Sequence, residues 1–257
     1  MITVGIDVGS ITTKAAVVEN GKLLVEKIIE TGYNAKDAGK AVYRDILADS
    51  GLSASSVEKI VSTGYGRNSV EFAQKTVTEI TCHAVGAHYL NPAVRSVIDI
   101  GGQDSKAIAI DENGSVKDFA MNDKCAAGTG RFLEVMARAL QVDLDDFGEV
   151  SLKADRPSKI SSLCTVFAES EVISLISKGE KRENIIAGIH EAIAARVAAM
   201  ANRIGITAPT MMTGGVAKNI GVLYALEKKI GQRIDVSPKT QVTGAIGAAL
   251  LAQKSLK

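Results

Sequence analysis

The sequence predicts an α/β protein with two similar domains, and three observations support this class. A motif of the form Asp-x-Gly-x4-Lys occurs at 7–14 and again at 99–106, each time after a run of apolar residues. An Asn-Gly turn follows each lysine at nearly the same distance, at Asn20 and at Asn113. Helical periodicity then recurs along the chain. We therefore expect a duplicated unit in which a strand hairpin opens each sheet and helices complete each domain.

The elements follow from these patterns in the order of the chain. Alternating apolar residues at Ile2, Val4 and Ile6 indicate the first strand, and the Asn-Gly turns place a hairpin after each glycine motif. Helical periodicity predicts helices at 37–50, 79–90, 130–140, 165–178, 182–204 and 220–230, with a last helix at 243–255. Strand-like segments lie at 58–63, 209–213 and 232–236. The Asn91-Pro92 pair predicts the boundary between the two domains.

Composition excludes several classes of protein. The 30 basic and 29 acidic side chains leave a formal charge of +1, which predicts neither a nucleic-acid nor a membrane partner. The amino-terminal segment MITVGIDVGS is typical of a strand rather than a signal peptide, and the apolar stretches are too short or too charged to span a bilayer. We therefore expect a cytoplasmic protein. Its three unevenly spaced cysteines do not form a disulfide framework.

The two glycine motifs are candidate phosphate-binding turns. The chain has no GxxxxGK[ST], GxGxxG, HExxH or CxxC motif, so phosphate binding needs another device. Glycine lets backbone N–H groups approach phosphate oxygens, and hydroxyls or a lysine add donors. The donors expected from the two turns are Ser10, Thr12, Thr13 and Lys14 on one side and Gly101, Gly102 and Gln103 on the other. Asp7 and Asp99 would face each other across a cleft and hold a hydrated Mg²⁺. The alternative is a pair of ordinary hairpins with solvated lysines.

A third glycine turn, Thr213-Gly214-Gly215-Val216-Ala217-Lys218-Asn219, follows a short apolar segment. A base and a ribose could lie against the bare backbone of its two glycines. The alternative is a simple helix entry in which Asn219 acts as the cap.

Two cysteines lie close to predicted helix starts. Cys125 precedes AAGTGRFLEVMARAL and Cys164 precedes TVFAESEVISLISK, and the positive end of a helix favours a thiolate. Two thiolates are too few for a four-thiolate iron–sulfur or metal site, but a twofold dimer would supply four. The alternative is that both cysteines are small core residues. Cys82 has no glycine turn beside it and is predicted to be a packing residue, and the three histidines have no ligand spacing.

The three glycine turns resemble the two phosphate motifs and the adenosine motif of the actin, hexokinase and heat-shock-chaperone ATPase superfamily. That resemblance implies two domains that close over Mg-ATP. It also implies that the terminal helix returns to the first domain, which gives a first domain of 1–92 plus 243–257 and a second domain of 93–242. Gln103 or Asp99 would orient or activate the attacking water.

Longer segments carry a closer resemblance. STGYGRNS (62–69), IDIGGQDSK (98–106), MNDKCAAGTGRFLE (121–134), CTVFAESEVIS (164–174) and MTGGVAKN (212–219) are similar to the activator component of (R)-2-hydroxyacyl-CoA dehydratases. The ATP-binding subunits of benzoyl-CoA reductases are related to that family. The resemblance implies a homodimer with one [4Fe–4S] cluster between its subunits, held by Cys125 and Cys164 of each. It also implies a separate acyl-CoA dehydratase as partner and a reduced ferredoxin or flavodoxin as electron donor.

On this interpretation Asp7, Asp99 and Gln103 are the catalytic residues, and Asp7 holds Mg²⁺ through water. The nucleotide-binding residues are Gly9, Ser10, Ile11, Thr12, Thr13, Lys14, Gly101, Gly102, Gln103, Gly214, Gly215, Lys218, Asn219 and Gln241. Ile11 and Lys218 depart from the family pattern, where many relatives have threonine and several have glutamine. Ile11 removes one hydroxyl from the first turn, although Thr12 and Thr13 remain.

The predicted function is an ATP-driven, one-electron transfer to a dehydratase. Two alternatives belong to other classes. A small-molecule kinase of the same fold would phosphorylate a substrate, and a zinc-bridged ATPase would act only as a conformational switch, because four thiolates suit zinc as well as iron.

Overall fold

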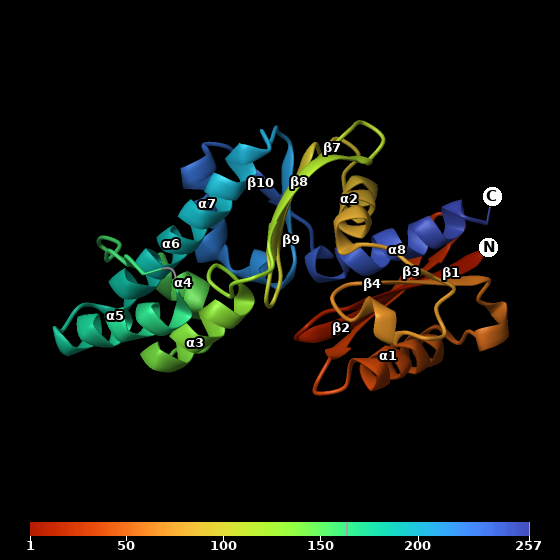
Figure 1. Cartoon of the computed structure of the whole chain (residues 1–257), viewed down its shortest axis with the longest axis horizontal. Helices are drawn as coiled ribbons and strands as arrows, with labels where there is room; N and C mark the ends of the chain where they lie inside the picture. Colours follow the sequence, from red (N-terminus) through yellow and green to blue (C-terminus); the bar gives the residue numbers. More distant parts are fainter. Residues whose placement is uncertain (163, 257) are drawn as a thin grey trace. The chain divides into compact units, whose positions relative to one another are not determined.

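The structure is a computed structural model that describes residues 1–162 and 164–256 of the chain. Leu163 and Lys257, which fall within the two predicted domains, lie outside the described residues. The predicted α/β class is confirmed, with two five-stranded sheets flanked by helices (Figure 1). The chain forms two compact units.

The first unit comprises Met1–Val97, Ile110–Lys117 and Ser237–Lys257. Its sheet has the strand order β3-β2-β1-β4-β5, in which β2 is antiparallel to both neighbours and β4 is parallel to β1 and β5. The unit contains β1 (Ile2–Val8), β2 (Thr12–Glu19), β3 (Lys22–Glu30), α1 (Ala35–Ser50), β4 (Lys59–Thr63), β5 (Lys75–Thr76), α2 (Glu79–Leu90) and α8 (Thr243–Lys254), with short 3₁₀ turns η1 (Ala54–Ser56), η2 (Arg67–Ser69) and η4 (Thr240–Val242).

Helices α1 and α8 cover opposite faces of this sheet. Val17 of β2 packs in the cluster that includes residues of α1, whereas its neighbour Ala16 packs in a cluster with residues of α8. Glycine permits the close approach of α8 to β1, because a Cβ atom on Gly5 would lie 2.0 Å from the carbonyl oxygen of Ala245. The end of β1, where Asp7 lies, is therefore fixed by packing on both sides.

The second unit comprises Ile98–Ala109 and Asp118–Val236. The second sheet has the strand order β10-β9-β6-β7-β8, the same order as in the first sheet when the strands are counted along the chain. The remaining elements are β6 (Ser96–Ile100), β7 (Ser105–Ile110), β8 (Val116–Asn122), α3 (Gly130–Leu140), α4 (Phe147–Ser151), α5 (Thr165–Ser177), α6 (Arg182–Arg203), β9 (Thr210–Thr213), η3 (Gly215–Lys218), α7 (Ile220–Ile230) and β10 (Ile234–Val236). The repeated strand order is the structural counterpart of the repeated glycine motif.

Helix α6 is the centre of the core in the second unit. Its buried face contributes Ile185, Ile189 and Val197 to a cluster that also contains Phe132 of α3 and Phe147 of α4. By length and composition alone, α6 is the one helix among the described residues that could cross a membrane. However, 61% of its most apolar window is buried inside the protein. Such burial is what the core helix of a packed domain shows. The short helix α4 has no counterpart among the elements predicted from the sequence.

Candidate functional site

The first glycine turn connects β1 to β2 and presents an acidic and a basic side chain together. Asp7 is opposite Lys14 in the antiparallel register, and Lys14 Nζ lies 3.6 Å from Asp7 Oδ2. Gly9 closes the turn by donating its N–H to the Thr12 carbonyl at 3.1 Å. A Cβ atom at Gly9 would lie 2.8 Å from that carbonyl oxygen and 3.0 Å from Lys14 Nζ. Glycine is therefore required for this turn to be as tight as it is.

Hydrogen bonds of threonine side chains hold the first turn against Thr31, the residue that follows β3. The Thr31 hydroxyl donates to the Gly9 carbonyl at 2.8 Å, and it also shares a 2.9 Å hydrogen bond with the buried Thr13 hydroxyl. Ser10 and Thr12 are only partly buried. Of the three hydroxyls predicted to bind phosphate, those of Ser10 and Thr12 are therefore the accessible ones, and a phosphate role for Thr13 stays a prediction. Thr31 is a residue that sequence reasoning missed.

The second glycine turn connects β6 to β7 and buries its lysine. Lys106 is 1% exposed, and its Nζ lies 3.2 Å from Asp99 Oδ2 and 2.8 Å from Asp104 Oδ2. Asp104 occupies the position that Thr12 has in the first motif, and sequence reasoning missed it. Gln103 is exposed at the tip of the turn. Two carboxylates stabilise the buried ammonium, which leaves Gln103 as the side chain that can reach a ligand.

The third glycine turn lies directly against the second. The Thr213 hydroxyl donates to Asp99 Oδ1 at 2.9 Å. Gly214 has φ +86°, and a Cβ atom there would lie 2.3 Å from the Ile100 carbonyl oxygen and 2.9 Å from Asp99 Oδ1. The structure therefore brings together Asp99, the β6–β7 turn and the start of the predicted adenosine motif. The positive φ and the close approach to the Ile100 carbonyl explain why glycine is needed at this position.

The first unit contains an equivalent glycine that the sequence analysis did not single out as a site residue. Gly64 follows β4 with φ +88°, and a Cβ atom there would lie 2.3 Å from Asp7 Oδ1 and 2.6 Å from the Val8 carbonyl oxygen. Gly64 thus has the same relation to Asp7 that Gly214 has to Asp99. The signal available in the sequence was a Thr-Gly pair at the end of a strand in both halves, at Thr63 and at Thr213.

The remaining predicted nucleotide-binding residues lie in η3, at the start of α7 and in η4. Asn219 accepts hydrogen bonds from the backbone N–H groups of Gly221 and Val222, both at 3.0 Å, and so caps α7. Lys218 is exposed beside it. Gln241 is partly buried in η4, which packs against β2 and β3 in the first unit. The nucleotide roles of these three residues, and the facing of Asp7 and Asp99, stay predictions.

The second glycine turn is hydrogen-bonded to the start of α3. The backbone N–H groups of Gly130 and Arg131 donate to the carbonyl oxygens of Gly101 and Gly102, both at 2.9 Å. The first residues of α3 are therefore hydrogen-bonded directly to the turn that we predict to bind phosphate. The loop that immediately precedes α3 contains Cys125.

The cysteines differ in environment. Cys164 is exposed and is the N-cap residue of α5, and Cys125 is half-buried in the loop between β8 and α3. Helices α3 and α5 pack against each other in the second unit. Cys82 is fully buried, as predicted, and burial raises the pKa of its thiol to about 12. Cys125 and Cys164 are thus the two thiols with access to solvent.

Polar side chains hold the Cys125 loop. Asn122 Nδ2 donates to the Cys125 carbonyl at 2.7 Å, and Arg196 Nη2 donates to Asn122 Oδ1 at 3.2 Å. Within residues 1–162 and 164–256, no three His, Cys, Asp or Glu side chains are grouped so that they could hold a metal ion. Cys125 and Cys164 of one chain do not by themselves complete a four-thiolate set.

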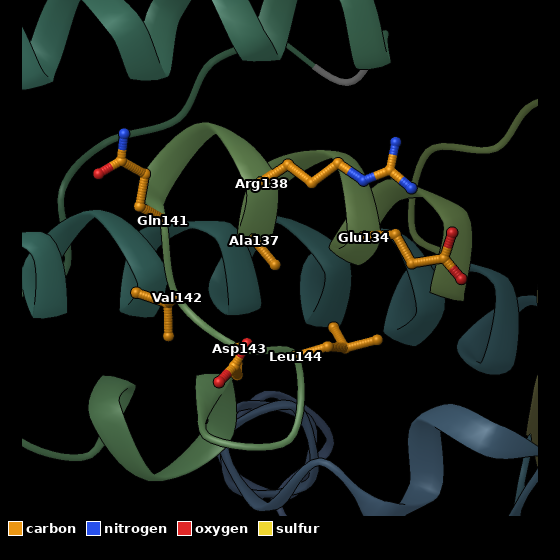
Figure 2. A pocket seen from close by; sticks show the side chains of 7 residues that line it. All are labelled: Glu134, Ala137, Arg138, Gln141, Val142, Asp143 and Leu144. Carbon is orange, nitrogen blue, oxygen red and sulfur yellow. The ribbon is translucent and has the colours of Figure 1, made fainter.

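A surface pocket of about 330 Å³ lies at the end of α3, away from the glycine turns in sequence (Figure 2). Its lining comes from α3 and the loop after it, and consists of Glu134, Ala137, Arg138, Gln141, Val142, Asp143 and Leu144. None of the predicted site residues lines this pocket. It is not part of the candidate nucleotide or thiol site.

Comparison with known proteins gives concordant matches along almost the whole chain. The BadF/BadG/BcrA/BcrD ATPase family matches residues 4–252. The activator of lactoyl-CoA dehydratase from Anaerotignum propionicum is 47% identical over 256 residues, which cover 99% of this chain and 98% of that protein. Both matches include the three glycine turns and both cysteine motifs.

Solved structures agree with these sequence matches. Component A of (R)-2-hydroxyglutaryl-CoA dehydratase from Acidaminococcus fermentans has a TM-score of 0.96 at 46% identity and covers all of both chains. The activator of 2-hydroxyisocaproyl-CoA dehydratase from Clostridium difficile, with bound ADPNP, has a TM-score of 0.93 at 43% identity, covering 100% of this chain and 98% of that one. A glucokinase from Streptomyces griseus, 16% identical with a TM-score of 0.64, covers 99% of this chain and 100% of that one and shows the hexokinase-like fold alone.

Proposed function

This chain belongs to the BadF/BadG/BcrA/BcrD ATPase family, and from that membership we propose that it hydrolyses ATP to activate a separate 2-hydroxyacyl-CoA dehydratase. This proposal is supported by the sequence identity of 47% between this chain and a dehydratase activator, over nearly the full length of both proteins. The observation that carries the proposal is the hydrogen-bonded link from the Gly101-Gly102 turn to α3. That link connects the turn that we assign to phosphate with the helix that follows the loop of Cys125.

Nucleotide binding is assigned to the accessible groups of the two turns. Ser10 and Thr12 donate hydroxyl hydrogen bonds to phosphate oxygens, and Lys14 adds positive charge. Asp7 holds Mg²⁺ through water, as carboxylates commonly do in phosphoryl-transfer sites. The base and ribose lie against Gly214 and Gly215.

The role of orienting the attacking water is assigned to Gln103 rather than to Asp99. Both oxygens of Asp99 are already engaged, one by Lys106 and one by Thr213. Gln103 is exposed at the tip of the same turn. Asp99 therefore positions the turn, and Gln103 orients the water, as phosphoryl transfer depends mainly on positioning.

Cys125 and Cys164 are assigned to a metal site shared between two chains. Their chemistry fits a shared iron–sulfur site, because both thiols have access to solvent and Cys164 caps a helix whose positive end favours a thiolate. We infer a homodimer in which each chain supplies these two ligands. When bound, a [4Fe–4S] cluster supplies one-electron chemistry between a reduced ferredoxin or flavodoxin and the dehydratase.

The proposal is tested by combining anaerobically purified protein with the dehydratase component of the Acidaminococcus fermentans system, ATP and a chemical reductant. We expect dehydration that requires ATP, and about four iron atoms per dimer. Cys164→Ser should lower the iron content of the whole dimer, because each chain supplies half of the ligands.

Other outcomes identify the alternatives. Stoichiometric zinc without iron would indicate the zinc-bridged switch. Colourless protein that phosphorylates a small molecule would indicate the kinase. Iron at the expected level, with no ATP dependence of dehydration, would contradict the coupling that the proposal requires.

A further inference from the structure

Glu171, in the second turn of α5, has its carboxylate directed back at the segment that precedes the helix. Ser161 donates its backbone N–H to both Glu171 oxygens at 3.0 Å and its hydroxyl to Oε1 at 2.9 Å. Ser162 donates its backbone N–H to Oε2 at 3.0 Å. Burial acts to raise the pKa of Glu171, but these hydrogen bonds outweigh it and lower the pKa below its ordinary value. The side chain is therefore a carboxylate that binds two consecutive residues, Ser161 and Ser162; we call this set of hydrogen bonds the grip.

This grip lies immediately before Cys164. Ser162 is two residues from Cys164, so the Cα atoms of the two are at most about 7.2 Å apart. On its other side the Cys164 carbonyl accepts a 2.8 Å hydrogen bond from the Ala168 N–H in the first turn of α5. The Cys164 side chain makes no capping hydrogen bond and is exposed. Hydrogen bonds thus hold Ser161 and Ser162 on the N-terminal side and the Cys164 carbonyl on the C-terminal side, while the Cys164 sulfur stays available.

The Cys125 loop shows that this is not an isolated feature. There Asn122 holds the Cys125 carbonyl, and Arg196 of α6 holds Asn122. Each of the two accessible thiols is therefore next to backbone that a polar side chain fixes. Glu171 is the stronger of the two acceptors, because it is charged and takes four hydrogen bonds from Ser161 and Ser162.

We propose that Glu171 is a positioning residue for Cys164. By fixing the segment before α5, Glu171 holds the Cys164 thiol in the place where a metal cluster is bound. The inference rests on the proposed function, in which Cys164 is a cluster ligand. Residues that fix ligands from outside the coordination sphere control how tightly a metal is retained. Glu171 has this relation to Cys164 through the backbone, without contacting the metal itself.

Glu171→Gln tests the proposal, and Glu169→Gln is the matched control. Glu169 lies on the same helix and the substitution removes the same charge, but no hydrogen bond or ion pair is seen for Glu169 among the described residues. Three quantities are measured on anaerobically prepared protein: hydrogen exchange at Ser161 and Ser162, the rate of iron loss to a chelator, and the electron paramagnetic resonance signal of the reduced protein. Far-ultraviolet circular dichroism checks that each variant is folded.

For Glu171→Gln we expect faster exchange at Ser161 and Ser162, an altered resonance signal, and iron loss faster by about tenfold or more. Glu169→Gln should behave as the unsubstituted protein does. Faster exchange with unchanged iron loss and an unchanged signal would show that the grip is structural only and overturn the proposal. Unchanged exchange would overturn it as well. A lack of iron in the unsubstituted protein is a separate result, since it contradicts the proposed function itself.

Discussion

Asp7 and Asp99 occupy equivalent positions of the two sheets but have different partners. Asp7 has Lys14 at 3.6 Å, whereas Asp99 is held by Lys106 at 3.2 Å and by Thr213 at 2.9 Å. A carboxylate with two short contacts is fixed and has little capacity left for a new ligand. Asp99 is therefore suited to hold its turn, and Asp7 is the one of the two that we propose holds a hydrated cation.

The first prediction concerns these catalytic roles. Asp7→Asn and Gln103→Ala should each reduce ATP turnover at least about tenfold, because a loss of about 1.4 kcal/mol of transition-state stabilisation has that effect. Turnover is measured as phosphate release at saturating ATP. Asp118→Asn, whose carboxylate contacts only the neighbouring Phe119 N–H among the described residues, is the control. If either site variant kept turnover within about threefold, under 1 kcal/mol, its assigned role would be wrong.

The second prediction concerns pH and His190. The residue is 1% exposed, its ring packs edge-on against Phe147 at 5.5 Å, and burial lowers its pKa to about 3. Below about pH 6.5 the unfolded chain binds a proton at this residue and the folded chain does not, so the fold is destabilised as pH falls from about 6.5 towards 3. Between pH 7 and pH 5 this amounts to about 2 kcal/mol of unfolding free energy.

Urea unfolding at the two pH values measures this effect. His190→Leu should reduce the pH 7 to pH 5 difference by about 2 kcal/mol. Phe147→Leu is the control, because it alters the same packing without removing a titratable group, and it should lower stability at both pH values alike. An unchanged difference in His190→Leu would show that His190 is protonated in the folded protein.

At the scale of elements, the hydrogen bonds between the second turn and α3 are the feature with the clearest functional meaning. A ligand that displaces the carbonyls of Gly101 and Gly102 must also displace the first turn of α3, because Gly130 and Arg131 donate to them. Helix α3 in turn packs on α5, the helix that Cys164 caps. Both thiol-bearing segments are thus connected to the turn through packed secondary structure.

The third prediction tests this link. Gly130→Pro removes the N–H that donates to the Gly101 carbonyl and points a ring carbon at that oxygen, so it breaks the link, although the first position of a helix otherwise accepts proline. Gly130→Ala adds a Cβ atom but keeps the N–H, so it is the matched control. In protein freed of metal, we expect ATP to change the alkylation rate of Cys125 in Gly130→Ala and not in Gly130→Pro. Equal responses in the two variants would show that the signal does not pass through this hydrogen bond.

The sequence was informative wherever a structure depends on neighbouring residues. The hairpins after Asp7 and Asp99 were predictable, because apolar strands and glycine turns lie next to each other in the chain. Thr31, Gly64 and Asp104 were not predicted as site residues, although each contacts a predicted one. Thr31 and Gly64 reach the first turn only after β3 and β4 join the sheet, and the value of Asp104 depends on the burial of Lys106. Such relations arise from tertiary packing, which periodicity does not describe.

For the whole molecule, the two units divide the proposed work. The first contains Asp7, its turn and Gln241, and the second contains Asp99, the other two glycine turns and both accessible cysteines. We propose that ATP is bound by turns of both units, so that ATP binding changes the conformation of the unit that contains Cys125 and Cys164. The account therefore predicts that nucleotide state alters the surroundings of the thiols.

The measurement that tests this most directly is iron release to a chelator from anaerobically prepared protein, followed by absorbance, first with ADP and then with ATP. Binding of both nucleotides is confirmed and each is present at saturation. We predict faster iron loss with ATP, because activation of a dehydratase requires the redox site to become accessible to its acceptor. Equal rates with the two nucleotides would contradict the account, since an ATPase and a cluster would then be present without any coupling between them.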